Sequence, residues 1–150
     1  MVHGPRAPAV VAMGSWSGRG YLALMPSTNG LWDWLGRPEG LARAHGGFNI
    51  VGGLWPLLSV RSFEAVFGPK EDRWLEYTVA GLLLVNGVEQ VLSSRRGEVD
   101  TARRLGIGTA ATLAAIDAVY VPAGRIRWTY AIDAALEVGW IVLWIRRGRT

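Results

Sequence analysis

Residues 128–145, WTYAIDAALEVGWIVLWI, form an apolar stretch of 18 residues without Lys or Arg, whose only charged side chains are Asp133 and Glu137. Its last part, IVLWI at residues 141–145, leaves no polar stripe on a helical projection. A helix that is apolar on every side is buried in a large core or lies in a bilayer. Because a span needs roughly 20 such residues, this stretch predicts a transmembrane helix.

Three further stretches, residues 46–60, 74–92 and 105–121, are also apolar and free of Lys and Arg. The four stretches contain five acidic and no basic residues, whereas the rest of the chain contains 16 basic and 7 acidic residues. The net charge of +4 therefore combines a negative interior with a basic periphery. A nucleic-acid-binding surface would place basic residues along a helix, so nucleic acid is excluded as the main partner. The absence of Cys excludes a disulfide scaffold.

The basic residues predict the topology. Eleven lie before residue 45, in residues 93–104 or after residue 145, and five lie in residues 61–73 and 122–127. The richer side faces the cytoplasm in membrane proteins. The excess of Arg over Lys is typical of a GC-rich bacterial genome. We therefore expect a multi-pass protein of the bacterial cytoplasmic (inner) membrane, with both termini cytoplasmic and the lipid bilayer as its partner. Trp74 and Trp128 at the outer interface and Trp144 at the inner one fit an aromatic belt.

Composition divides the chain in two. Residues 1–40 hold four of the seven Pro and scattered Gly, which predicts a flexible N-terminal tail. Residues 41–150 are expected to form a four-transmembrane-helix domain, an all-α integral membrane four-helix bundle. A soluble four-helix bundle is the alternative, but it needs a charged face on each helix, and VAGLLLV at residues 79–85 has none.

Two patterns concern helix packing. Arg-Trp opens the second and fourth stretches and Arg-Arg-Gly follows each, which favours two parallel helical hairpins. Small residues recur every four positions, as at Gly106 and Ala110 on one stretch and Ala131 and Ala135 on another, and such series let helix backbones approach closely in lipid. Pro56 should bend the first helix or leave a backbone carbonyl free.

Polar side chains inside the apolar stretches are the candidate site, because each is costly in lipid and should face the bundle interior. Tyr130, Asp133 and Glu137 follow at spacings of three and four and so share one helix face. The other stretches contribute Asp117, Asn86, Glu89, Asn49 and His45. By their positions along the helices, these eight residues form a staggered series from the outer to the inner surface.

Three functions fit such an interior. Carboxylates can relay protons or bind ions, which favours proton, ion or small-solute transport. The polar groups can instead hold helices together in a structural or interaction subunit of a membrane complex. A small membrane enzyme acting on a lipid or quinone could use Asp133 and Glu137 as proton carriers.

The chemistry-bearing motifs are few. No Walker loop or Glu-x-x-His signature occurs, and two His are too few for a His-rich metal site. A loose G-x-G-x-x-A match at residues 106–111 follows two Arg rather than a strand, so we interpret it as helix packing. We predict no catalytic residue, metal or cofactor, and leave open a homo-oligomer or a partner in a membrane complex.

The outer loop carries a resemblance. It contains RSFE at residues 61–64, FGPK at 67–70 and DRWL at 72–75. It is similar to uncharacterised small four-helix membrane proteins of bacteria, over about residues 45–145. The resemblance implies the same fold and location, and no activity.

Overall fold

The structure, a computed structural model, describes residues 28–147 of the 150-residue chain. These residues form six helices and no strand: α1 (Thr28–Gly36), α2 (Pro38–Leu58), α3 (Val60–Phe67), α4 (Arg73–Arg95), α5 (Val99–Tyr120) and α6 (Tyr130–Arg147). The four long helices correspond to the four apolar stretches, and the all-α class is confirmed. Of the predicted tail, residues 1–27 lie outside the described residues, while residues 28–40 contain α1 and the start of α2.

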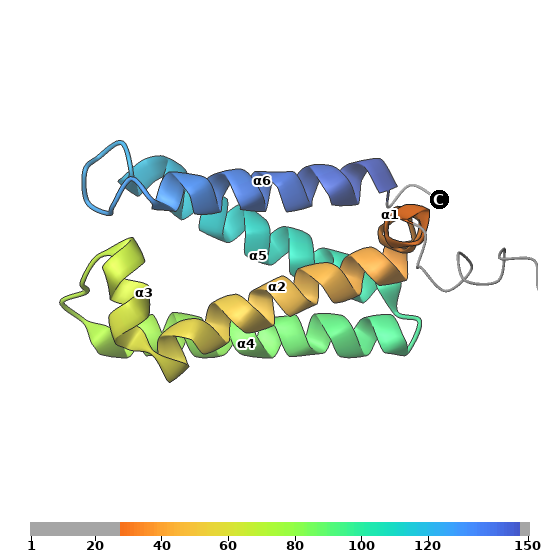
Figure 1. The fold of residues 1–150 in the computed structure, drawn as a ribbon, viewed down its shortest axis with the longest axis horizontal. Helices are drawn as coiled ribbons and strands as arrows, with labels where there is room; N and C mark the ends of the chain where they lie inside the picture. Colours follow the sequence, from red (N-terminus) through yellow and green to blue (C-terminus); the bar gives the residue numbers. More distant parts are fainter. Residues whose placement is uncertain (1–27, 148–150) are drawn as a thin grey trace, which may run out of the picture.

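The long helices form two antiparallel pairs. α2 packs most extensively on α4 and α5 packs on α6, and contacts between α4 and α5 join the pairs. α2 and α5 run in the same direction, as do α4 and α6 (Figure 1). We call the end with α1, the α4–α5 connection and the last turn of α6 the α1 end. We call the opposite end, with α3 and residues 121–129, the α3 end.

Glycine brings the backbones of α2 and α4 into contact. A Cβ added to Gly46 would lie 2.7 Å from the carbonyl oxygen of Gly87, and one added to Gly53 would lie 2.6 Å from that of Ala80. Both approaches are too close for any real side chain, so the helices need Gly here. The small residues Ala131 and Ala135 on α6 were expected at a helix contact, but both are exposed on the outside of the bundle.

The first long helix breaks after Pro56 rather than at it. α2 continues through Pro56 to Leu58, and α3 then turns away by 109°. Ser59 adopts φ −152° and ψ 77° at the break, and its N–H donates to the Trp55 carbonyl over 2.9 Å. Ser62 Oγ accepts the indole N–H of Trp55 over 2.8 Å. These bonds hold the corner that places α3 across the end of the bundle.

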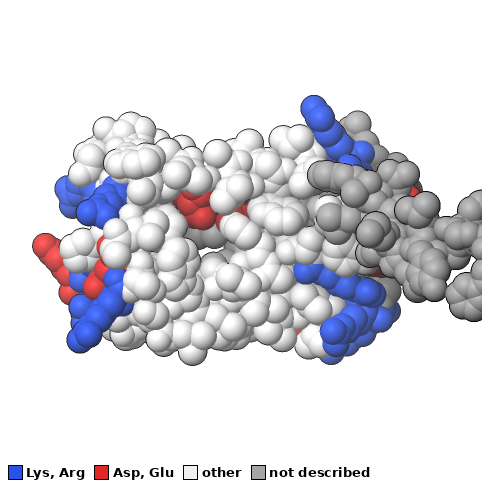
Figure 2. All heavy atoms as spheres, in the orientation of Figure 1, with Lys and Arg blue, Asp and Glu red and all other residues white. Residues whose placement is uncertain are grey.

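The exterior of the bundle is apolar between two charged ends. Figure 2 shows basic and acidic side chains gathered at the ends and a band without charge between them, interrupted by one acidic patch. Large apolar side chains are exposed along this band: Val79, Leu82 and Val85 on α4, and Ile132, Leu136 and Val138 on α6. The residues buried in the bundle include many polar ones, which reverses the usual order of a water-exposed protein.

Measured against the length and hydropathy of a membrane span, no described helix qualifies alone, and the bent pair of α2 and α3 qualifies jointly.

Candidate functional site

His45 on α2 is at the centre of the site and is completely buried. Trp144 donates its indole N–H to His45 Nδ1 over 3.0 Å, and Trp140 stacks on the imidazole with ring centroids 4.5 Å apart and 4° between the planes. Because Nδ1 accepts a hydrogen bond, the neutral ring carries its proton on Nε2. Two Trp of α6, one turn apart, thus fix both the orientation and the tautomer of His45.

Glu137 on α6 faces the proton-bearing side of this ring. Its Oε2 lies 4.0 Å from His45 Nε2, which is too far for a hydrogen bond. Glu137 is only 1% exposed, and both its carboxylate oxygens and His45 Nε2 have no hydrogen-bond partner among the described residues. Buried polar atoms are normally paired, because an unpaired one costs about 1–3 kcal/mol. The pair is therefore held close but unsatisfied.

Two amides extend the polar cluster toward α4. Asn49 Nδ2 donates to Gln90 Oε1 over 3.2 Å, and both side chains are completely buried. Gly106 on α5 makes room for Gln90, His45 and Trp144: a Cβ there would collide with Gln90 Nε2, and would lie 2.8 Å from His45 Nδ1 and 3.0 Å from Trp144 Nε1. We call His45, Asn49, Gln90, Glu137 and Trp144 the buried cluster. Side chains of α2, α4 and α6 form this cluster, and Gly106 of α5 leaves the space that it occupies.

Acidic side chains continue from the buried cluster toward the α3 end. Asp133 lies one turn before Glu137 on α6, and its charge interacts with that of Asp117 on α5. Asp117 is 4% exposed and its Oδ2 has no partner among the described residues. Glu76 on α4 is also buried, and neither of its carboxylate oxygens has a hydrogen-bond partner among the described residues. An acidic patch opens through the apolar band between α2 and α6 (Figure 2).

The loop between α5 and α6 is hydrogen-bonded to α3 at the α3 end. Arg127 Nη1 donates to the carbonyl of Ala65 over 2.8 Å, and Thr129 Oγ1 donates to that of Val66 over 2.9 Å. Free carbonyls at a helix C-terminus need such partners. Tyr130 at the start of α6 contacts the Phe67 ring, with centroids 4.7 Å apart. The loop of residues 121–129 therefore holds α3 in place.

Glu64 on α3 makes an ion pair with the start of α4. Its Oε2 lies 3.2 Å from Nη2 of Arg73. Residues 60–67 form a helix, and that helix presents Glu64 to Arg73.

The eight residues predicted from the sequence fall into three groups. His45, Asn49 and Glu137 lie together in the buried cluster, and Asp117, Asp133 and Tyr130 lie toward the α3 end. Glu89 lies elsewhere: it accepts from Ser93 over 3.1 Å and pairs with Arg96 over 3.3 Å, with its side chain 44% exposed. Asn86 is half-buried on α4, one turn before Gln90.

Sequence reasoning missed the roles of Gln90, Gly106 and Trp144 in the buried cluster. The sequence predicts Trp144 at the inner membrane interface, but the structure buries it completely against His45. The signal was present, because Trp144 continues the face of α6 that Glu137 occupies, at a spacing of seven residues. Trp74 and Trp128 are 64% and 70% exposed.

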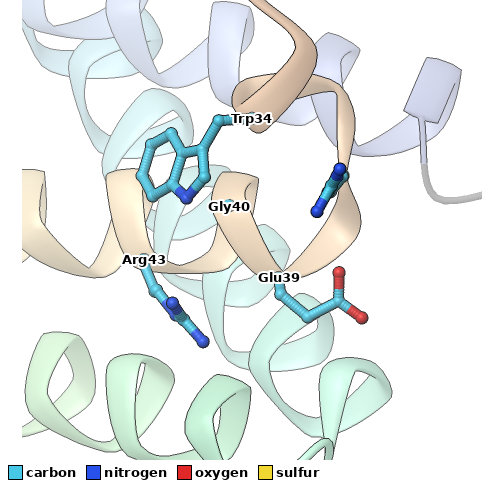
Figure 3. A pocket seen from close by; sticks show the side chains of 5 residues that line it. Trp34, Glu39, Gly40 and Arg43 are labelled. Atoms are coloured by element: carbon cyan, nitrogen blue, oxygen red, sulfur yellow. The ribbon is translucent and has the colours of Figure 1, made fainter. Parts of the chain in front are cut away.

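A separate hollow lies at the α1 end. It is lined by Trp34, Arg37, Glu39, Gly40 and Arg43 (Figure 3). Arg43 Nε donates to Ser94 Oγ over 3.3 Å, and Ser94 Oγ donates to the Glu39 carbonyl over 3.0 Å. These bonds join the start of α2 to the end of α4. None of the lining residues belongs to the buried cluster, so the hollow is a surface feature.

No family model, curated protein or solved structure matches this chain. Within residues 28–147, no three His, Asp or Glu side chains lie close enough together to hold a metal ion. The interior of the described part of the chain carries buried carboxyl, imidazole and amide groups. Among these, the groups that are buried and unpaired can change their protonation or their partners.

Proposed function

We propose that this chain is a bacterial inner-membrane protein whose four long helices cross the bilayer, with the α1 end in the cytoplasm. The apolar band between two charged ends supports this, because it matches a bilayer between two aqueous surfaces (Figure 2). Among the described residues the α1 end carries more basic residues than the α3 end, as the positive-inside rule requires of a cytoplasmic side. The eight at the α1 end are Arg37, Arg43, Arg95, Arg96, Arg103, Arg104, Arg146 and Arg147.

The modest hydropathy of the single helices is consistent with this proposal. Acidic residues within α4, α5 and α6 lower the hydropathy of each helix, but the bundle buries Glu76, Asp117 and Glu137. Lipid would therefore contact Val, Leu and Ile rather than these carboxyls. Polar residues inside membrane bundles are expected to face the interior in this way.

The interior supports proton binding and release in a proton-coupled transport cycle. The observation that carries this function is the buried pair of Glu137 and His45, 4.0 Å apart and unpaired on the facing atoms. Polar groups that merely hold helices together would be hydrogen-bonded to each other, as interhelical bonds in membranes are. An unpaired carboxyl and an imidazole that face each other can instead gain or lose a proton and change their separation.

The route to this pair has a direction. From the α3 end, Asp117 and Asp133 lead to Glu137 through the interior of the bundle. On the opposite side, the indole N–H of Trp144 covers His45 Nδ1. A proton can therefore reach the ring only at Nε2, from the side of Glu137. Release toward the α1 end requires Trp144 to move, and such alternation of access is what separates a coupled carrier from a simple pore.

Proton uptake by reconstituted protein tests the function. The full chain is placed in liposomes that contain a pH-sensitive dye, and uptake is followed after a pH step. Glu137→Gln should lower the initial rate about 100-fold or more, because a group that transfers protons contributes on this scale. Glu89→Gln, which alters an exposed Glu of α4, should leave the rate unchanged.

Three results would contradict the proposal. The first is a Glu137→Gln protein with the rate of the unaltered chain, and Glu137→Asp checks folding by keeping the carboxyl. A stoichiometric protein partner on purification, without proton uptake, favours a structural subunit. A bound lipid or quinone at Asp133 and Glu137 favours an enzyme.

A further inference from the structure

The hollow at the α1 end differs in charge from the interior of the bundle. It has a volume of about 400 Å³, and its lining includes two Arg and one Glu. Sites for small ligands have volumes of about 300–1,000 Å³. The hollow is therefore large enough for a small charged group, and its balance of charge favours an anion.

A helix contact fixes one wall of the hollow. A Cβ added to Gly40 would collide with the carbonyl oxygen of Trp34, and it would lie 3.2 Å from Cδ2 of the indole. The backbone N–H of Arg37 donates to the same carbonyl over 3.1 Å. The glycine thus lets α1 lie directly on α2, and this contact holds Trp34 beside the start of α2 (Figure 3).

Arg43 is the cation of the hollow that the structure orients. Its Nε donates to Ser94 Oγ over 3.3 Å, and Ser94 donates to the Glu39 carbonyl over 3.0 Å. Within residues 28–147, the two Nη groups of Arg43 have no hydrogen-bond or ion-pair partner. The Glu39 carboxylate extends away from Trp34 and Arg43 (Figure 3). A guanidinium with free Nη groups matches a phosphate in both shape and charge.

The hollow lies at the border between the apolar band and the charged α1 end. Arg43 precedes the apolar stretch 46–60 by three residues, and Ser94 follows the stretch 74–92 by two. In the proposed orientation, this border lies at the headgroups of the cytoplasmic leaflet. Trp and Arg are both favoured at that depth. Basic pockets on this side of a membrane bind anionic headgroups.

We propose that the hollow binds the headgroup of an anionic phospholipid, with the phosphate on the Nη groups of Arg43. Arg37 adds a second positive charge, and the indole of Trp34 forms an apolar wall. A zwitterionic lipid carries the same phosphate together with an ammonium group, which the two Arg repel. The hollow therefore selects the anionic headgroup. This inference rests on the proposed membrane location and is independent of the proton route.

Native mass spectrometry of the full chain in detergent micelles tests this at an ionic strength of about 0.15 M. The chain is titrated with phosphatidylglycerol or with phosphatidylcholine of the same acyl chains, and the dissociation constant of the first bound lipid is measured. Phosphatidylglycerol should bind more tightly. Arg43→Gln should weaken its binding about 10-fold, because a hydrogen bond to a charged group contributes on this scale. Arg104→Gln, an exposed site on α5 outside the hollow, should change it by less than about twofold because of screening.

Two variants test the built hollow without a change of charge. Gly40→Ala pushes the Trp34 carbonyl away, and Ser94→Ala removes the acceptor of Arg43 Nε. Both should weaken phosphatidylglycerol binding, with circular dichroism as the check of folding. Gly47→Ala is the matched control on α2, because no atom lies within 4 Å of a Cβ there. If Gly40→Ala does not fold, Ser94→Ala and Arg43→Gln decide alone.

The contrary results are distinct. Equal losses in Arg43→Gln and Arg104→Gln, or equal affinity for the two lipids, would overturn the inference, because general attraction would then explain binding. Displacement of bound phosphatidylglycerol by inorganic phosphate would assign the hollow to a free anion and overturn the lipid as its ligand. None of these results bears on proton uptake. An unaltered chain without proton uptake would overturn the proposed transport function, and the lipid titrations would still decide what the hollow binds.

Discussion

Gly106→Ala tests whether the buried cluster converges on α5. The new methyl group would collide with Gln90 Nε2, and would lie 2.8 Å from His45 Nδ1 and 3.0 Å from Trp144 Nε1. At least one of these groups must move, and the 3.0 Å hydrogen bond between Trp144 and His45 cannot survive unchanged. The substitution therefore displaces polar groups of the buried cluster, although Gly106 itself has no polar side chain.

The expected loss in the free energy of unfolding is the sum of two effects. Overpacking a tight site costs about 1–3 kcal/mol, and a hydrogen bond contributes about 1 kcal/mol. Together they destabilise the fold by about 2–4 kcal/mol. Ala is a better helix former than Gly by roughly 1 kcal/mol, which offsets part of the loss at Gly106. Gly108→Ala is the matched control on α5, because no heavy atom lies within 4 Å of a Cβ there.

The assay is reversible unfolding of the full chain in mixed micelles, followed by tryptophan fluorescence. Gly108→Ala should leave the free energy of unfolding unchanged or raise it by up to roughly 1 kcal/mol. Gly106→Ala should lie about 2–4 kcal/mol below that control. Free energies for the two variants that agree within about 0.5 kcal/mol, the usual scatter of surface substitutions, would refute the packing argument.

Two further predictions concern the helix contacts. Gly53→Ala should separate α2 from α4 and lower the melting temperature far more than Gly47→Ala, whose Cβ meets no atom within 4 Å; equal melting temperatures would count against the close contact. Arg127→Gln removes the donor to the Ala65 carbonyl, so it should raise hydrogen exchange in α3 relative to the unaltered chain and leave α2 protected. Unchanged exchange in α3 would show that this cap does not hold the helix.

Much of the fold follows from the distribution of charge along the chain. Runs without Lys and Arg coincide with the long helices α2, α4, α5 and α6, because helices that share one apolar exterior exclude basic side chains from their middle. The helical spacing of Tyr130, Asp133 and Glu137 also placed the acids of α6 on one face. Residues 60–67 escaped prediction as a helix because eight residues are too few for a clear periodicity.

The composition of the site was less predictable, because spacing on one helix does not specify which helix it faces. The face of α6 that holds Glu137 also holds Trp144, yet only the packing of α2 against α6 places His45 between them. Gly106 illustrates the same limit: in sequence it is one small residue among several, and its importance comes from three polar groups on other helices.

The central claim is that Glu137 binds and releases a proton inside the bundle. Infrared difference spectroscopy of the full chain in nanodiscs, between acid and alkaline buffer, detects this directly through the carbonyl stretch of a protonated carboxyl. The proposal predicts that one component of the pH-dependent carboxyl absorption of the unaltered chain is lost in Glu137→Gln and kept in Glu89→Gln. A spectrum that is identical in the unaltered chain and Glu137→Gln would contradict it.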